Sequence, residues 1–449
     1  MILRMRRLHR LSCGLVVVLA VVTVASAEDW PQWLGPRRDG VWREEGIVDV
    51  LPQKLDIVWR REIGGGYAGP AVADGRVFVT DRVLEKGEIN PEDPFSRQAV
   101  QGKERLHCLD AKSGKALWRH EWPSRYEVSY PVGPRATPTV SDGKVWTLGA
   151  MGDFFCLDAK SGDVIWTKSC VEDLGAEINV WGTSAAPLVD GKKVILLAGG
   201  RPDACVVAFE RDTGKTLWRA LDEPDPGYCP PIIVEAGGTR QLIVWTPTRL
   251  SSLDPQTGRV HWSEPFEVRS SLSISTPIHD PERSLLLVTS FYNGSMMMRL
   301  ARDRPAAELV WKGSSSSERK TDGLHSIMCT PVFRGAHFFG VCSYGQLRCL
   351  ESETGARVWE TLEATGSGRW WNAFIVPQGD RYFIANEQGE LLTAELSSRG
   401  FKELSRTRLI EPTNRAQRRQ VVWSHPAFAN RCVYARNDRE IVCVDLSQK

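Results

Sequence analysis

The chain has 449 residues, of which 42% are hydrophobic and 25% are charged, and its formal net charge is +2. This ordinary globular composition excludes a disordered chain, a collagen-like chain and a protein with many membrane spans. The near balance of acidic and basic residues gives no reason to expect nucleic acid or an anionic membrane as a partner.

Residues 1–27 have the order of a secretory signal peptide. Four Arg and no acidic residue precede an apolar run over Leu15–Val24, and Ala25-Ser26-Ala27 follows. The run is too short to span a bilayer, so we expect a cleaved leader and no transmembrane span in the mature chain. Removal of these four Arg from the 57 basic residues leaves 53 against 55 acidic residues. The expected location is the periplasm or the cell envelope.

Residues 28–55 lie before the first repeat and are predicted to form an N-terminal arm. Beyond them, a short apolar strand ends near an acidic residue, a Thr/Ser-Gly turn follows, and the next strand carries a Trp. This theme recurs every 44 to 52 residues. The tryptophans at this position are Trp118, Trp166, Trp218, Trp262, Trp311 and Trp359. In the seventh unit we expect Leu404 in the Trp position.

Each unit also has an upstream half, in which Pro or Ala begins an apolar strand and a turn joins it to a second strand. These strands begin at Pro70, Pro138, Pro187, Pro231, Pro277, Pro331, Ala373 and Pro426. Gly and Asp supply the turn dihedrals, and Pro is tolerated at the first position of a strand. Four short antiparallel strands in a period of roughly 40–50 residues are typical of a propeller blade. The sequence therefore predicts an all-β, eight-bladed β-propeller over residues 56–449.

The two ends of the repeated region are complementary. The last unit stops at Ile441–Leu446 without its Trp strand, and the first is preceded by an extra strand over Ile57–Arg61. We therefore expect the N- and C-terminal strands to pair and close the ring, which leaves no open sheet edge.

The tryptophans and cysteines have structural explanations in this scheme. A Trp on the outer strand of most blades is expected to pack against the neighbouring sheet. Cys108, Cys156, Cys349 and Cys443 occupy equivalent strand positions. Equivalent positions in successive repeats rarely come within bonding distance, so we expect buried thiols and no disulfide framework.

The Asp-x-x-Thr/Ser-Gly-x-x-x-Trp core resembles the PQQ-like repeat family of eight-bladed propellers. That family includes the quinoprotein dehydrogenases and the outer-membrane assembly lipoprotein BamB. Residues 29–40, which begin Asp29-Trp30-Pro31-Gln32-Trp33, and the stretch Trp423–Arg431 look like segments of exported bacterial members. The resemblance covers residues 56–449 and implies the propeller fold, while most members of that group have no assigned activity.

Candidate binding residues lie in the loops that lead into the innermost strands, because these loops gather at one mouth of a propeller's central channel. They are Tyr67, Arg135, Trp181, Tyr228, Arg269, His325, Arg369, Trp370, Trp371, Trp423 and His425. Aromatic residues and Arg are enriched at recognition surfaces, so these loops are a candidate site for a planar or anionic ligand or a partner. Alternatively, the aromatic side chains only cover the top of each sheet.

Two functions are compatible with this sequence. The first is an exported, monomeric, non-catalytic scaffold of the BamB kind that binds a protein or envelope component at the channel mouth, without a cofactor or metal. The alternative is an oxidoreductase that holds pyrroloquinoline quinone (PQQ) and Ca²⁺ at the same mouth, as the resemblance to quinoproteins implies. Ca²⁺ needs several oxygen ligands, and substrate oxidation needs a carboxylate base. The rim offers few candidates, without an evident cluster: Glu177, Asn179, Asp225, Asp322 and Asn372.

Other patterns are interpreted as structural. The quinoprotein alcohol dehydrogenases carry a vicinal Cys-Cys pair that this chain lacks, and its scattered His residues predict no zinc site. Gly64-x-Gly66-x-x-Gly69 fits a dinucleotide fingerprint but joins two strands, so we expect a rim loop. Residues 83–105 are expected to form the one sizeable insertion, either a solvated hairpin or a docking tip for a partner.

Overall fold

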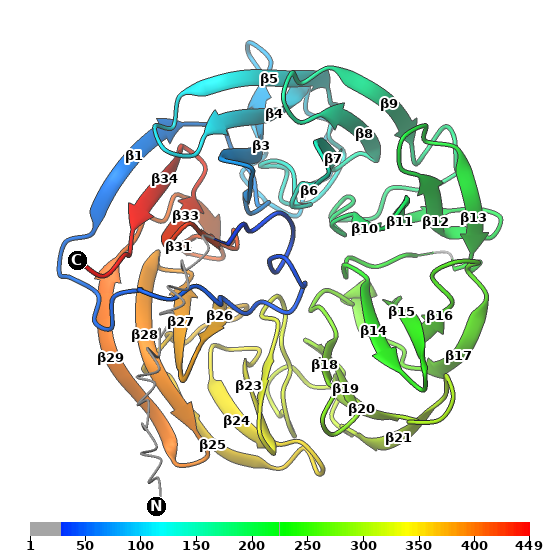
Figure 1. Cartoon of the computed structure of the whole chain (residues 1–449), viewed down its shortest axis with the longest axis vertical. Helices are drawn as coiled ribbons and strands as arrows, with labels where there is room; N and C mark the ends of the chain where they lie inside the picture. The colour runs from blue at the N-terminus through cyan, green and yellow to red at the C-terminus, as the bar shows by residue number, and fades with distance from the viewer. Residues whose placement is uncertain (1–27, 224) are drawn as a thin grey trace, which may run out of the picture.

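The computed structural model describes residues 28–223 and 225–449. In this part of the chain, eight four-stranded antiparallel sheets are arranged around a ring, as predicted (Figure 1). The expected leader, residues 1–27, lies outside the described residues. In the described ranges, no helix is both long and apolar enough to cross a membrane.

The innermost strand of each blade is short and begins where the sequence predicts it. These strands are β2 (Ala71–Ala73), β6 (Thr139–Ser141), β10 (Leu188–Asp190), β14 (Ile232–Ala236), β18 (Ile278–Asp280), β22 (Val332–Arg334), β26 (Ala373–Gln378) and β32 (Ala427–Ala429). The second strands are β3 (Arg76–Leu84), β7 (Lys144–Leu148), β11 (Lys193–Gly200), β15 (Thr239–Trp245), β19 (Leu285–Ser290), β23 (His337–Val341), β27 (Arg381–Asn386) and β33 (Cys432–Arg436).

The third strands are β4 (Gly102–Asp110), β8 (Asp153–Asp158), β12 (Ala204–Glu210), β16 (Arg249–Leu253), β20 (Gly294–Leu300), β24 (Leu347–Glu351), β28 (Glu390–Ser397) and β34 (Glu440–Asp445). The outer strands are β5 (Ala116–Pro123), β9 (Val164–Ser169), β13 (Thr216–Ala220), β17 (Val260–Pro265), β21 (Ala307–Lys312), β25 (Arg357–Thr361), β29 (Gly400–Arg408) and β1 (Asp56–Glu62). A short 3₁₀ turn, η1 (Arg269–Ser271), precedes β18.

The ring closes through the two ends of the chain, as predicted. The eighth sheet has the order β1-β34-β33-β32, so its outer strand comes from the start of the propeller. A bulge in β1 places Trp59 opposite Cys443, and the same arrangement places Trp118 opposite Cys108 in the first blade. β1 therefore supplies both the missing strand and the missing Trp of the last unit.

Most of the repeated tryptophans fasten a blade to the next one. Trp118 Nε1 donates to the carbonyl of Ala159 at 3.1 Å, and Trp166 Nε1 donates to that of Arg211 at 3.0 Å. The rings lie on the turn glycine of the next blade, where a Cβ on Gly214 would be 2.7 Å from the Trp166 ring. The repeated Gly is needed at this position because only glycine lets the indole approach so closely and also adopts the positive φ of 69°.

The assignment of Leu404 to the Trp position of the seventh blade is wrong. In β29, Ser405 pairs with Thr393 and Glu403 pairs with Ala394. Leu404, between them, is the bulged residue and has no partner on β28. In the other blades the skipped residue is the one before Trp, for example Leu117 before Trp118. The position therefore holds a small hydroxyl side chain in this blade.

The cores lie between neighbouring blades, and the cysteines are part of them. In the described part of the chain ten cysteines are free thiols, and nine of them are buried. The N-terminal arm also contributes, because Trp30 and Trp42 belong to the cluster that spans the first, seventh and eighth blades.

The arm crosses the centre of the ring (Figure 1). Trp30 forms a β-bridge with Val72 of β2, and Arg38 donates to the carbonyls of Ala186 and Pro187 beside β10. Trp42 donates its backbone N–H to Pro377 of β26. Contacts on several sides of the ring thus hold the arm inside the channel.

The expectation of a single insertion is wrong. Residues 85–101 do connect β3 to β4 as a long excursion, but a second hairpin, β30 (Asn414–Ala416) and β31 (Arg419–Val421), lies between β29 and β32. Its short strands and many Arg residues hid it in the sequence.

Candidate functional site

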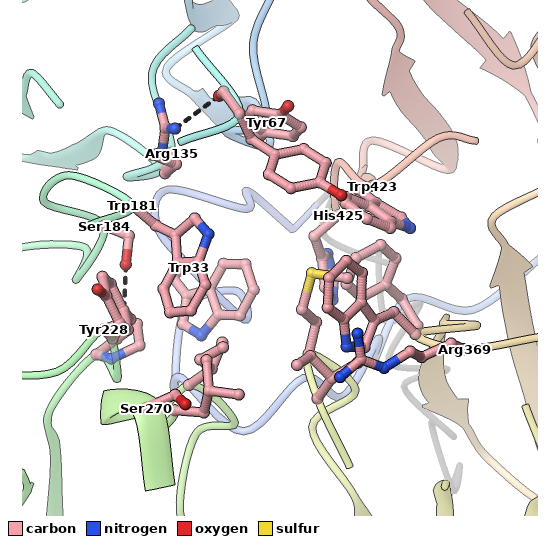
Figure 2. Close-up of a pocket in the computed structure, with 18 of the residues that line it drawn as sticks. Trp33, Tyr67, Arg135, Trp181, Ser184, Tyr228, Ser270, Arg369, Trp423 and His425 are labelled. Carbon is pink, nitrogen blue, oxygen red and sulfur yellow. Dashed lines mark hydrogen bonds between the residues drawn. The ribbon is translucent and has the colours of Figure 1, made fainter. Parts of the chain in front are cut away.

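A cavity of about 390 Å³ opens where the loops that lead into the innermost strands converge (Figure 2). We call it the mouth cavity. Every blade contributes to its wall, and ten of its twenty lining residues are Trp, Tyr or Phe. The lining residues are Trp33, Tyr67, Phe95, Tyr130, Arg135, Trp181, Ser184, Tyr228, Pro230, Ser270, Leu272, Ile274, Tyr292, Ile327, Met328, Arg369, Trp370, Phe374, Trp423 and His425.

Eight of the eleven candidate residues line this cavity. They are Tyr67, Arg135, Trp181, Tyr228, Arg369, Trp370, Trp423 and His425. The structure brings these side chains together from six different loops, although they are spread over more than 350 residues of sequence. Whether they bind a partner stays a prediction.

The other three candidates do not line the cavity. His325 is fully buried, with Nδ1 at 3.2 Å from the carbonyl of Phe291 and Nε2 at 3.3 Å from Asp322. Arg269 is exposed and lies over the Tyr292 ring. Trp371 is buried against the backbone of Gly345 and Gly366.

The neighbours Trp370 and Trp371 differ because of the backbone between them. Trp370 has a φ of 65°, in the left-handed region, and its side chain lines the mouth cavity, whereas Trp371 is buried against Gly345 and Gly366. Sequence alone does not reveal which of two adjacent tryptophans adopts such a conformation.

Twelve of the twenty lining residues were not among the candidates, and four of them are aromatic residues outside the strands, from three kinds of position. Phe95 and Tyr292 lie in loops between second and third strands, which open on the same face as the loops that were considered. Tyr130 lies five residues before Arg135 in the same loop, further from the innermost strand than the candidate residues. Trp33 comes from the arm, and no repeat pattern indicates its position.

Trp33 and His425 form one wall of the cavity. Trp33 Nε1 donates to Thr276 Oγ1 at 2.9 Å, and its ring lies 5.1 Å from that of His425. Burial lowers the pKa of His425 to about 4, although a contact between Nδ1 and the carbonyl of Pro426 opposes this shift. The imidazole is therefore neutral at physiological pH and contributes an apolar surface.

Arg135 is the cation of the cavity that has no acidic partner. Its guanidinium donates to the carbonyls of Ser129, Tyr130 and Gly133 at 2.5–2.9 Å and lies 5.3 Å from the centre of the Tyr67 ring. Within residues 28–223 and 225–449, no carboxylate lies within 4 Å of it in an ion pair. Backbone carbonyls thus hold the guanidinium at the cavity wall.

The charge of Arg369 is neutralised by an ion pair with Glu318. It donates to both oxygens of Glu318 at 2.7 and 2.9 Å and to Tyr292 Oη at 2.9 Å. The guanidinium also lies 4.6 Å from the centre of the Trp370 ring. Glu318 thus fixes Arg369 and the aromatic side chains beside it.

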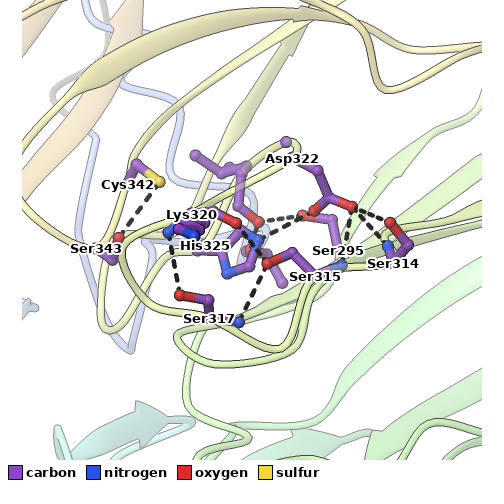
Figure 3. Close-up of polar contacts among 12 residues, drawn as sticks. Ser295, Ser314, Ser315, Ser317, Lys320, Asp322, His325, Cys342 and Ser343 are labelled. Carbon is purple, nitrogen blue, oxygen red and sulfur yellow. Dashed lines mark hydrogen bonds and ion pairs between the residues drawn. The ribbon is translucent and has the colours of Figure 1, made fainter.

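The loop that carries Glu318 is organised by Asp322 (Figure 3). The Asp322 carboxylate accepts the backbone N–H groups of Ser314 and Ser315 at 2.6 and 2.9 Å. Partial burial opposes its ionisation, but these donors, with the Ser314 hydroxyl and His325, hold the pKa of Asp322 at about 2. The carboxylate is therefore already used to hold the loop.

Trp423 is held by a buried carboxylate behind it. Its indole Nε1 donates to Glu387 Oε2 at 2.9 Å, and Arg419 of β31 donates to the same carboxylate. Burial raises the pKa of Glu387, while the bonds from Arg419 and Trp423 favour its charged form. The β30–β31 hairpin thus supports one side of the mouth cavity.

The donor set does not fit a quinone with its calcium ion. None of Glu177, Asn179, Asp225, Asp322 and Asn372 lines the mouth cavity, and no carboxylate is among its lining residues. Among the residues that the structure describes, no group of three His, Cys, Asp or Glu side chains could hold a metal. Ca²⁺ at this mouth would lack carboxylate ligands, and an alcohol would lack a carboxylate base.

Known proteins similar to this chain include both BamB and quinoprotein dehydrogenases. The family model described as outer membrane protein assembly factor BamB matches residues 102–361. The structure of BamB from Moraxella catarrhalis is similar with a TM-score of 0.56 and 14% identity, over 87% of this chain and 100% of that one. Quinohemoprotein alcohol dehydrogenase from Comamonas testosteroni is similar with a TM-score of 0.60 and 13% identity, over 95% and 82%.

A second quinohemoprotein alcohol dehydrogenase, from Pseudomonas putida HK5, has a TM-score of 0.59 and 12% identity, over 94% of this chain and 80% of that one. No curated protein sequence matches the chain. At these identities the structural similarities show the fold alone.

Proposed function

The chain belongs to the family described as outer membrane protein assembly factor BamB, and on that basis we propose that it is an exported, non-catalytic scaffold that binds a protein or envelope component at its mouth cavity. The family model covers more than half of the chain. The family's description supports a protein partner at the cell envelope, and the leader-like residues 1–27 support export to the periplasm. We expect the protein to act as a monomer.

The observation that carries this proposal is the make-up of the mouth cavity. Its wall combines large aromatic side chains with Arg135 and Arg369 and lacks a carboxylate. Trp, Tyr and Arg dominate the residues whose truncation costs most in protein–protein binding. General acid–base chemistry needs a titratable group near neutral pH, whereas His425 is neutral and buried.

The supports behind the wall also suit a recognition surface. Glu318 and Glu387 hold Arg369 and Trp423 from behind, at distances of 2.7–2.9 Å. Side chains fixed in this way lose little conformational entropy when a partner binds. The wall is thus prepared for binding before a partner arrives.

The experiment that tests the proposal is the addition of pyrroloquinoline quinone and Ca²⁺ to the purified protein. We expect no stoichiometric bound chromophore and no dye-linked oxidation of alcohols. A bound chromophore with turnover would overturn the scaffold proposal and establish the oxidoreductase instead.

A further inference from the structure

The two ends of the arm segment 28–44 meet at a buried carboxylate. The backbone N–H of Glu28 donates to Glu44 Oε1 at 3.0 Å, although the two residues are sixteen positions apart in the sequence. Glu44 Oε2 accepts the indole N–H of Trp42 at 2.8 Å and the backbone N–H of Arg431 at 2.9 Å. Glu44 is only 3% exposed. Its carboxylate therefore closes the base of the segment that crosses the ring (Figure 1).

No cation in the described part of the chain compensates this carboxylate. All three donors to Glu44 are neutral N–H groups, and no Lys, Arg or His side chain among the described residues forms an ion pair with it. The adjacent Arg43 pairs with Asp39 instead. Glu28 adds a second acidic group, whose Oε2 is buried and has no hydrogen-bond partner there. Because a buried charge without an opposite charge is costly, this site calls for a cation.

The segment that Glu44 closes also builds the mouth cavity. Trp33, in the middle of the segment, forms part of the cavity wall. The turn between β32 and β33 contacts both ends of the segment, because the Asn430 N–H donates to the carbonyl of Glu28 at 3.2 Å and the Arg431 N–H donates to Glu44. The position of Trp33 therefore depends on how firmly the base of the segment is held.

We propose that removal of the leader between Ala27 and Glu28 creates the cation that Glu44 lacks, and that the resulting ion pair locks the arm in the channel with Trp33 at the mouth cavity. The protein thus completes its binding site only after export. This inference rests on the proposed function, because only an exported chain loses its leader.

The charge arises from an ordinary hydrolysis. The expected cleavage site follows Ala25-Ser26-Ala27, so the bond that breaks joins Ala27 to Glu28. A leader peptidase adds water across this bond: Ala27 gains a carboxylate, and the Glu28 nitrogen becomes an α-amino group. This group is mostly protonated at neutral pH, and a carboxylate at hydrogen-bond distance favours the charged form further. The nitrogen that gains the charge is the one that already donates to Glu44.

Two chains that differ only at the N-terminus test the proposal. One begins at Glu28, released from a fusion tag by a protease that leaves no extra residue, and the other begins at Ala25, so that its ammonium group lies three residues away. Hydrogen exchange is measured at the Trp30 amide, which donates to the Val72 carbonyl at 2.8 Å. This amide should exchange about tenfold more slowly in the chain that begins at Glu28. Equal exchange rates would overturn the proposal.

Glu44→Gln is the matched variant, because it keeps the shape of the side chain and removes its charge. The difference in exchange between the two chains should then fall below about twofold. Glu45→Gln is the control: Glu45 is the next residue and is exposed, so the full difference should remain. A difference that persists in Glu44→Gln would contradict the assignment. The Ala159 amide, bonded within the second blade, should exchange equally in all chains, and a parallel change there would overturn a local lock.

Further outcomes separate this inference from the proposed function. N-terminal sequencing of the exported protein should give Glu28 as the first residue, and a different cleavage site would overturn the inference while the scaffold remains. A protein that keeps residues 1–27 would contradict export, and with it the proposed function. If the quinone binds with turnover, the scaffold fails, whereas the exchange rates still show whether Glu44 holds the new N-terminus.

Discussion

Trp59 lies opposite Cys443 in the same register in which Trp118 lies opposite Cys108, although the first pair joins the two ends of the propeller. The Trp59 indole donates to the carbonyl of Ala111 at 2.9 Å, and its ring packs on Gly114 of the first blade. The seam is therefore built like the other blade junctions, with the chain ends in place of a continuous repeat.

Deletion of residues 440–449 should abolish cooperative folding. The deletion removes β34, which pairs with both β1 and β33, and it exposes two sheet edges that favour aggregation. Soluble yield and the unfolding transition should be compared with those of a chain that lacks only the exposed Lys449. A soluble truncation with an unchanged midpoint would mean that the ends do not close the ring.

Gly214→Ala should destabilise the protein much more than Gly143→Ala. Both glycines have positive φ values, 69° and 73°, so both variants carry a similar backbone penalty of about 1–2 kcal/mol. The new methyl group meets the Trp166 ring at 2.7 Å at position 214 and finds no atom within 4 Å at position 143. The free energies of unfolding obtained from denaturant titrations should differ by a further 1–3 kcal/mol, roughly, which is the usual cost of overpacking. Equal losses would show that Trp166 does not pack on this turn.

Stability should fall on acidification through a contribution from His425. Its pKa is about 4 in the folded protein against an ordinary 6.5, because burial disfavours the charged ring. A lowered pKa means that the contribution is complete above pH 6.5 and is lost as the pH falls towards 4, by about 3 kcal/mol in total.

The control is His425→Gln, which cannot be protonated in this range. The difference in unfolding free energy between the native protein and this variant should change between pH 7 and pH 4. A constant difference would show that His425 is not desolvated in the mouth cavity.

Trp371→Ala and Trp181→Ala should behave differently, although both residues were sequence-based candidates for binding. Trp371 is buried against Gly345 and Gly366, so its loss should cost about 3–5 kcal/mol of stability. Trp181 is half-buried on the cavity wall, and its loss should cost under about 1 kcal/mol while weakening partner binding. Thermal unfolding of the two variants distinguishes these outcomes, and equal midpoints would contradict the placement.

The repeat made the fold predictable because one Trp and one turn glycine mark each blade, and because the ends complement each other. The error at Leu404 arose where both markers are weak: Ser405 replaces Trp, and no side chain lies near Gly400 to fix the register. The hydrophobic pattern of the sequence does not reveal a shift of one residue at a bulge.

The candidate site was predictable to the extent that it follows from the repeat. Many of the aromatic and Arg residues before the innermost strands were found, because every blade repeats that loop. Small and aliphatic lining residues of the same loops, such as Ser184, Ile274 and Met328, were not found. Trp33 could not be found because its position depends on the arm crossing the ring, which no periodic pattern encodes. Tyr130 and Trp370 point into the cavity through left-handed backbone conformations that their residue types disfavour.

The most direct test of the scaffold account is photo-cross-linking in cells from a residue of the mouth cavity. Ser270 lies on the exposed rim of the cavity, and Leu117, 45% exposed on the outer strand β5, is a control on the circumference of the ring. A photoreactive residue at position 270 should capture an envelope protein, and Trp181→Ala on the cavity wall should reduce its yield. Capture of that protein from position 117 but not from position 270 would contradict the account, because the partner would then bind the outside of the ring.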